Sequence, residues 1–348
     1  LSATEQRDFL QQKNQGHDSS LAMQIDVWSA NKITSAFAFA EHFPGDKRAP
    51  VALAQAAQEL FSAGDLKRSL EAATLVTSWQ PSVEKDLKTT TLLLTGHLYF
   101  DLEDYVQAEQ TYREVLPRLA GTKHGATIER IAASIYKRSE QQLLADNTRE
   151  AVANLLRIQG IAPDSSISVT GQYDAANHLM ALEAWAEAET VLLNFRRRYP
   201  RHVLTEAIAA KLVLVYEQSQ AWSKAADELS QIALNHEDGE VRRQSLYLAA
   251  VNYEKAEEWG AAIARFRRYA HAYAQPFEPL TEARFKMAEL YKRTDEPQKR
   301  KFWLRKLVLG HEQGPGTERS LYLAALSATE LAEKNYQDFV RLPLSLPL

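Results

Sequence analysis

The chain has 348 residues, 45% of them hydrophobic, and a formal net charge of −4, a balance that gives no global sign of binding to nucleic acid or to an anionic membrane. It contains no cysteine, which excludes disulfides, thiolate metal sites and cysteine nucleophiles. Glycine (13) and proline (12) are scarce and strong helix formers dominate, so the composition predicts an all-α protein.

The N-terminal stretch 1–17 is mostly polar and predicts a leader, either a weak helix or a frayed end. Because the chain begins with Leu1 rather than Met, we expect that a preceding segment has been removed. The remainder is expected to form a repeat region over 18–340. Its predicted units are 18–44, 45–82, 83–121, 122–163, 164–201, 202–237, 238–276 and 277–314, followed by a lone helix over 316–334.

The segment TGHLYFDLEDYVQAEQTYREVL (95–116) predicts two short helices folded back on each other. Gly96 and Tyr99 are three residues apart and share one face of the first helix. An acidic interruption comes next, and a second run opens at Tyr105. Its stripe is formed by Ala108, Tyr112 and Val115. Small residues on both helices allow a close approach, so the pattern indicates a helical hairpin.

The second half of this pattern recurs along the chain. Trp185, Trp222 and Trp259 open equivalent stripes and are spaced by 37 residues, and Thr148 stands one period earlier. Less regular copies begin at Ile33, Leu66, Pro297 and Tyr336. A recurrence of this length predicts stacked two-helix units that bury their faces against their neighbours. We interpret the stripe residues as core.

One repeat is almost literal. RQSLYLAA (243–250) returns as ERSLYLAA (318–325), two periods later. Near the end, KNYQDFVRL (334–342) is expected to begin a second helix that PLSLPL stops. An apolar tail broken by proline is not typical of a capping helix. We therefore expect the tail, 341–348, to be followed by further sequence in a longer chain.

The chain resembles the tetratricopeptide repeat (TPR) family. The segment 95–116 matches the family pattern nearly throughout, and the likeness covers about 20–340. Prolines that close units stand at Pro81, Pro163 and Pro200. The period of 37 exceeds the family's usual 34, and most units lack the glycine. The resemblance implies a right-handed α-α superhelix, a TPR-like solenoid of about eight helical hairpins, that binds proteins without catalysis.

Two segments resemble a narrower group, the TPR proteins of the bacterial cell envelope, of the Tol-Pal-associated and outer-membrane assembly types. They are 192–220, with an aromatic, a basic run and Tyr-Pro before an Ala-rich helix, and 41–65. This resemblance, together with the lack of cysteine, favours a periplasmic location. A cytoplasmic location remains the alternative.

Loops are expected at 121–127, 162–168, 236–240 and 311–317. The last is the richest in glycine and proline and is the predicted flexible joint, with 162–168 as the second candidate. No run of apolar residues is long enough to cross a membrane, so we expect no membrane insertion in this segment.

The sequence offers no recognisable catalytic, cofactor or metal site. No two of the nine histidines are three or four residues apart, and there is no Gly-rich phosphate loop, GxSxG or HExxH. Basic runs at 196–201, 265–271 and 299–306 lie on or just after second helices, where they suit the helix dipole. We interpret them as a solvated outer face; an anionic partner is an alternative, and nucleic acid is not expected.

The first helix of each unit is expected to line a concave face. The candidate partner-binding residues there are Tyr173, Asn177, Glu217, Tyr247, Glu254, Phe285, Glu289, Lys292 and Tyr322, and the same positions include Ala210, Leu214 and Val251. Tyr173, Tyr247, Phe285 and Tyr322 share one register. Aromatics alternating with carboxylates suit an extended or helical peptide. The alternative is that these aromatics pack within the solenoid.

The sequence therefore predicts a non-enzymatic TPR scaffold, with no cofactor, whose partners are proteins or peptides in a bacterial cell-envelope complex. A second hypothesis is the superhelical positioning or regulatory region of a larger cell-wall or polysaccharide-processing enzyme. A third is a cytosolic regulator.

Overall fold

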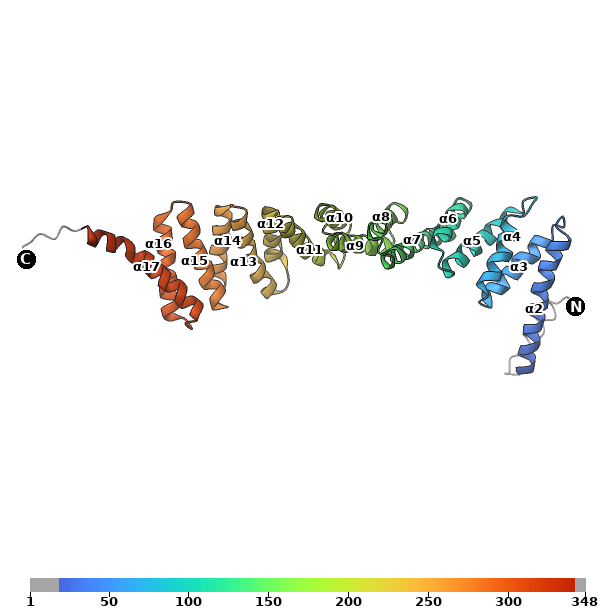
Figure 1. Ribbon diagram of the computed structural model, residues 1–348, viewed down its shortest axis with the longest axis horizontal. Helices are drawn as coiled ribbons and strands as arrows, with labels where there is room; N and C mark the ends of the chain where they lie inside the picture. The colour runs from blue at the N-terminus through green and yellow to red at the C-terminus, as the bar shows by residue number, and fades with distance from the viewer. Residues whose placement is uncertain (1–18, 342–348) are drawn as a thin grey trace, which may run out of the picture. The chain divides into compact units, whose positions relative to one another are not determined.

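The structure, a computed structural model, describes residues 19–341, and these residues form helices without any strand. Consecutive helices pack against each other within two compact units (Figure 1). The units divide at His178 and Leu179, inside one helix. The helices of the first unit are α2 (Ser19–His42), α3 (Ala49–Ser62), α4 (Leu66–Thr77), α5 (Lys85–Asp101), α6 (Tyr105–Val115), α7 (Gly121–Leu144) and α8 (Thr148–Ile161), with a 3-10 turn at Leu116–Arg118.

The helix α9 (Ser166–Ala181) contains the division between the units. The second unit continues with α10 (Trp185–Arg198), α11 (Thr205–Gln218), α12 (Trp222–Asn235), α13 (Gly239–Lys255), α14 (Trp259–Ala272), α15 (Phe277–Arg293), α16 (Pro297–Gln313) and α17 (Glu318–Val340). The predicted all-α architecture of consecutive helices is confirmed; the right-handed superhelical twist stays a prediction.

The repeat register predicted from the sequence is confirmed at seven turns. The stripes expected to begin at Leu66, Tyr105, Thr148, Trp185, Trp222, Trp259 and Pro297 begin second helices at those residues. Six pairs pack as hairpins: α3 with α4, α5 with α6, α7 with α8, α11 with α12, α13 with α14, and α15 with α16. The turn between α9 and α10 has the same local form.

All seven turns are built the same way. The residue two before the second helix has a positive φ, as at Glu257 (61°), and it is glycine only at Gly64. The following backbone N–H reaches five residues back, as from Glu258 to the Tyr253 carbonyl at 2.9 Å. The left-handed residue's own N–H binds the carbonyl three residues earlier, 3.1 Å from Glu257 to Glu254. This pair of bonds is the Schellman motif, which satisfies the last carbonyls of the first helix.

Two expected copies are wrong. The copy at Ile33 lies inside α2, so the unit expected over 18–44 is a single helix and not a hairpin. The copy at Tyr336 lies inside α17, which runs unbroken to Val340 instead of ending near 334 and starting again. The stripe recurs at both places, but no residue of left-handed conformation stops the helix before it.

Other expected boundaries also moved. The loop expected over 121–127 is the beginning of α7, although it includes two glycines and residues 121–126 are mostly exposed. The connection expected at 311–317 is shortened to 314–317, and the joint there stays a prediction. The predicted leader falls in the undescribed stretch 1–18, and nearly all of the tail falls in 342–348, also outside the described residues.

The small residue of each stripe lies where helices cross. Three residues into the second helix, a fully buried small side chain recurs at Ser69, Ala108, Ala151, Ala188, Ala225 and Ala262. The tryptophans that open the stripes are half-buried; Lys255 and Arg293 each lie over one of them, 4.2 Å from the Trp222 ring and 4.8 Å from the Trp259 ring. The stripe is therefore packing, as interpreted from the sequence.

Candidate peptide-binding surface

Tyr247 is the foremost of the predicted inner-face residues. Its ring packs edge-on against Phe266 and Tyr269 of α14, with centroids 5.6 and 5.3 Å away. Burial raises its pKa to about 12, with smaller contributions from neighbouring groups such as Glu282. The hydroxyl is thus protonated at neutral pH. Because the ring supports the core, Tyr247→Ala would leave a cavity, and the variant would not report on binding alone.

The other aromatics of that register differ in their surroundings. Phe285 packs against a small cluster formed by Leu307, Leu323 and Ala324, so it belongs to the interior of the second unit. Tyr322 is 55% exposed. Tyr173 is half-buried and lies in the first unit. The alternative interpretation, packing within the solenoid, therefore applies to Tyr247 and Phe285.

Most of the predicted polar residues are engaged by neighbouring helices. Glu217 accepts a hydrogen bond from Asn252 (2.8 Å), Glu254 pairs with Lys286 (3.0 Å), and Glu289 lies 3.9 Å from Arg300. Lys292 is exposed, and Asn177 is half-buried in the first unit. Of the nine predicted residues, all except Tyr173 and Asn177 lie in the second unit.

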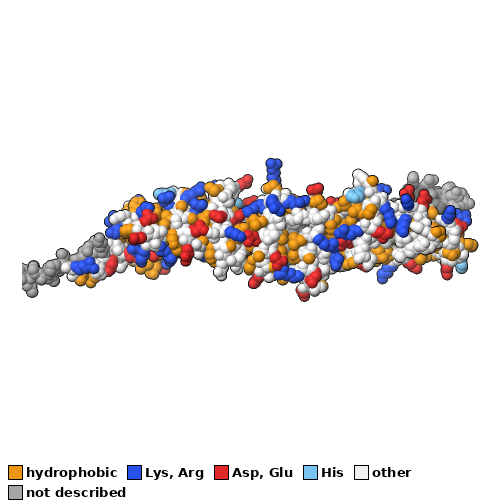
Figure 2. All heavy atoms as spheres, turned by 90° about the horizontal axis from the view of Figure 1, so that it is seen from above, with side chains coloured by type: hydrophobic (Ala, Val, Ile, Leu, Met, Phe, Trp, Pro, Cys, Tyr) orange, Lys and Arg blue, Asp and Glu red, His pale blue; other side chains and the backbone are white. Residues whose placement is uncertain are grey.

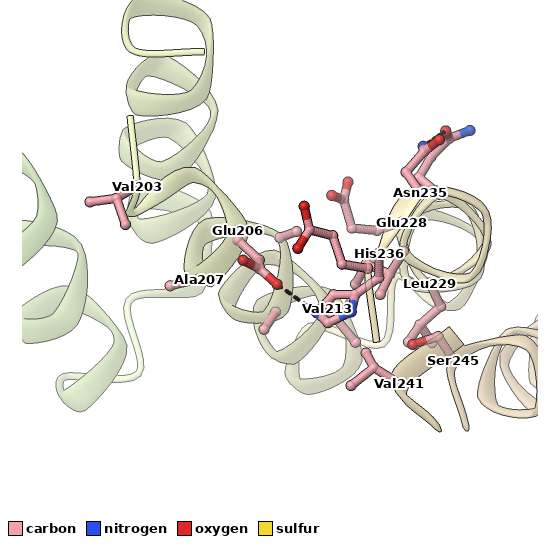
Figure 3. Close-up of a pocket in the computed structure, with 15 residues that line it drawn as sticks. Val203, Glu206, Ala207, Val213, Glu228, Leu229, Asn235, His236, Val241 and Ser245 are labelled. Atoms are coloured by element: carbon pink, nitrogen blue, oxygen red, sulfur yellow. Dashed lines mark hydrogen bonds and ion pairs between the residues drawn. The ribbon is translucent and has the colours of Figure 1, made fainter. Parts of the chain in front are cut away.

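Two of the hollows in the second unit have predicted inner-face positions in their lining. The smaller, about 470 Å³, is formed by the first helices α13, α15 and α17, and its lining includes Tyr247, Leu248 and Arg319. The larger, about 780 Å³, lies among α11, α12 and α13 (Figure 3). We call the larger one the Ala210 hollow. Its apolar lining includes Ala209, Ala210, Val213, Leu229, Ile232 and Val241.

The Ala210 hollow exists because three positions of the repeat carry smaller side chains than in the next unit. Ala210 is 37 residues before Tyr247, so it occupies in its own unit the position that Tyr247 occupies in the next unit. On the second helix, Leu229 and Ile232 take the places of Phe266 and Tyr269. In the next unit those three rings pack together. Here their volume is missing, and a hollow suited to an aromatic side chain remains open.

The charged groups around the Ala210 hollow pair with one another. Glu206 contacts His236, 2.5 Å from Oε1 to Nε2 (Figure 3). The Asp238 backbone N–H donates to Nδ1 of the same ring at 3.0 Å. Glu228 accepts from Arg196 at 2.7 Å. The hollow thus combines an apolar floor with acidic groups at its rim.

No group of three or more His, Asp or Glu side chains in the described part of the chain could hold a metal ion. None of the described helices is both long and apolar enough to cross a bilayer. On the face shown in Figure 2, basic and acidic side chains are interspersed.

Comparisons with known proteins found similarity only among solved structures. No protein-family model and no curated protein matches the chain. Among the structures is MamA 41-end from Desulfovibrio magneticus, at 15% identity and TM-score 0.32, covering 53% of this chain and 97% of that one. Another, the Naa15/Naa10 structure bound to HypK-THB, has 13% identity and TM-score 0.43, covering 85% and 43%.

A tetratricopeptide repeat protein from Parabacteroides merdae is also similar, at 14% identity and TM-score 0.30, covering 80% of this chain and 98% of that one. Tetratricopeptide repeat structures are thus among those that this chain resembles.

Sequence reasoning missed the Ala210 hollow, although the signal was present. Ala210 is one of the predicted inner-face positions, and it is the member that interrupts the aromatic register of Tyr173, Tyr247, Phe285 and Tyr322. Candidate binding residues are chosen for the contacts that their side chains can make, whereas the hollow is defined by a side chain that is absent.

Proposed function

We propose that this chain is a non-enzymatic scaffold that captures a protein partner by anchoring an aromatic side chain in the Ala210 hollow. The observation that carries the proposal is the missing tyrosine at a position where the next unit packs one against two further rings. A partner's Phe, Tyr or Trp would supply that ring from outside. Aromatic anchors in preformed pockets account for much of the energy of peptide recognition.

The surroundings of the hollow favour a basic residue close to the anchor. The Glu206 side chain is 72% exposed and Glu237 is also exposed, so both carboxylates can meet a cation from the partner. Neither Arg nor Lys lines the hollow. The partner motif is therefore an aromatic with a lysine or arginine beside it.

The smaller hollow at Tyr247 is a second contact for the same class of partner. Tyr247 lines this hollow, and its hydroxyl makes no hydrogen bond to any of residues 19–341. A backbone carbonyl of a bound peptide would accept its proton. Leu248, 45% exposed, adds apolar surface.

The setting that we propose is a protein complex of the bacterial cell envelope. The support is the likeness of 192–220 to TPR proteins of that compartment and the lack of cysteine. Fractionation of cells that express the full-length parent protein tests it. Recovery from the periplasm or bound to the outer membrane is expected, and recovery from the cytosol alone would refute the location.

Selection of displayed random peptides on the immobilised chain tests the anchor directly. Peptides enriched on the wild type should share one aromatic with a neighbouring Lys or Arg, and they should not be captured by Ala210→Tyr. The control is Arg197→Ala, on α10 and outside both hollows, which should select the same motif. A motif without an aromatic, or one that binds Ala210→Tyr equally well, would contradict the proposal.

A further inference from the structure

The last helix, α17, carries an exposed apolar stripe along its length. The stripe residues are Leu321, Ala325, Ala328, Ala332, Tyr336 and Phe339, and all of them are exposed. Their spacing of three and four residues places them on one face. Leu323 and Ala324, on a different face, are buried against the preceding helices. One side of α17 therefore packs on its own unit while an apolar side faces solvent.

The repeated hexapeptide SLYLAA shows what covers this face elsewhere in the chain. In α13, Leu246 is 3% exposed and Ala250 fully buried, in a core cluster with Phe266 and Tyr269 of α14. The equivalent residues of α17 are Leu321, which is 57% exposed, and Ala325, which is exposed.

The two copies differ in burial because only the first has a second helix packed on it. That helix, α14, lies against the α13 copy. Through residue 341, the end of the described chain, no helix comes after α17. The face that α14 buries on α13 is thus bare on α17.

The helix α14 indicates which side chains a helix covering the exposed face of α17 would need. That helix presents Ala262, Phe266 and Tyr269 to α13, a small residue followed by rings four and seven positions later. Its small residue permits close approach, and its two rings cover the Leu and Ala of the repeated segment.

We propose that α17 binds an amphipathic helix of a partner protein, laid antiparallel along the stripe as α14 lies on α13. The partner helix presents a small residue with aromatics four and seven positions on. This is helix-in-groove recognition with i, i+4 and i+7 anchors. It uses a different surface from the Ala210 hollow and does not depend on that hollow.

A peptide with the sequence of residues 257–273 is the probe, because it contains the α14 stripe. Fluorescence anisotropy of the labelled peptide, titrated with the complete 348-residue chain, should show saturable binding. Leu321→Glu and Ala325→Glu, which place a carboxylate on the bare face, should each weaken binding at least tenfold. Leu234→Glu is the matched control, because Leu234 is 51% exposed on α12, away from the stripe.

A peptide in which Phe266→Asp has been made should not bind. Circular dichroism should show that all three protein variants remain folded, since each substituted side chain is exposed. The proposal is overturned if the wild type does not bind the peptide, or if Leu234→Glu weakens binding as much as Leu321→Glu. It is also overturned if the chain forms a dimer that Leu321→Glu dissociates and the peptide does not compete with; the face would then belong to a second copy.

Discussion

At the scale of single residues, the packing of each hairpin depends on how little space one side chain takes. A Cβ atom added to Gly96 of α5 would lie 2.6 Å from Cε1 of Tyr112 of α6. Tyr112 is fully buried, and its hydroxyl lies 2.7 Å from Nδ1 of His97. The ring therefore cannot move away without losing both its packing and its hydrogen-bonding partner.

Gly96→Ala should lower the free energy of unfolding by roughly 1–3 kcal/mol, because the added methyl group overpacks this contact. Thermal or urea denaturation measures the change. Gly125→Ala is the control: Gly125 is an exposed residue of α7 with no atom within 4 Å of an added Cβ. It should be neutral or slightly stabilising, since alanine is the better helix former. Equal effects would show that the α5–α6 crossing is not as tight as described.

An ion pair joins successive hairpins in the first unit. The Glu109 carboxylate, 6% exposed, accepts two hydrogen bonds of 2.6 Å from Arg157 of α8 and one of 2.9 Å from Arg113. Burial raises the pKa of Glu109, but the bonds and charges of the two arginines lower it more, so the net shift is below its ordinary value of 4.5.

A carboxyl group whose pKa is lower in the folded state than in the unfolded state stabilises the fold at pH values above its unfolded-state pKa. This contribution to stability is lost as the pH falls through the folded-state pKa. The wild type should therefore lose more stability than Glu109→Gln between roughly pH 6 and pH 3. Urea denaturation across that range measures the difference. Glu140→Gln, which removes an exposed partner of Lys137, should change the pH dependence little. Parallel curves for wild type and Glu109→Gln would rule out this role.

At the scale of elements, the chain repeats one turn seven times, and six of the seven place a non-glycine residue at positive φ. Such a residue is strained in the left-handed region, typically by about 1–2 kcal/mol. This turn residue is Glu in three of the turns, Asp in two and Gln in one.

Glu257→Gly should raise the unfolding free energy by about 0.5–1 kcal/mol, because relief of the left-handed strain exceeds the extra entropy of glycine in the unfolded chain. Glu257→Ala is the control, since alanine keeps the strain while removing the same side chain. Melting temperatures of the three proteins decide between backbone and side-chain effects. Identical gains for Gly and Ala would attribute the change to the carboxylate and not to φ.

Much of this element structure could be predicted from sequence. Each unit needs the stripe of Trp and Ala residues in order to pack. The period of this stripe therefore predicted the first residue of seven second helices. The stripe does not by itself encode a turn, and this is why the copies at Ile33 and Tyr336 lie inside single helices. The two glycines at 121–127 predicted a loop, but these residues begin α7.

At the scale of the whole molecule, the binding surface was harder to predict than the fold. Aromatic residues at one register suggested a row of anchors. In the structure, however, Tyr247 packs against Phe266 and Tyr269, and Phe285 packs against the cluster around Leu307. Whether a side chain at that register is available depends on the size of its neighbours on the second helix. A single sequence gives the size of every side chain, but it does not show which side chains contact each other in the folded protein.

The measurement that tests the account most directly is the paired effect of Ala210→Tyr on stability and on binding. A tyrosine at this position fills the hollow from within, as Tyr247 does in the next unit. The unfolding free energy should rise by about 0.5–2 kcal/mol, as cavity-filling changes commonly achieve. Affinity for an aromatic peptide selected on the wild type should fall at least tenfold, a loss of about 1.4 kcal/mol or more. Opposite changes in the two quantities are the result predicted here. Unchanged peptide affinity in a stabilised variant would show that partners bind elsewhere on the chain.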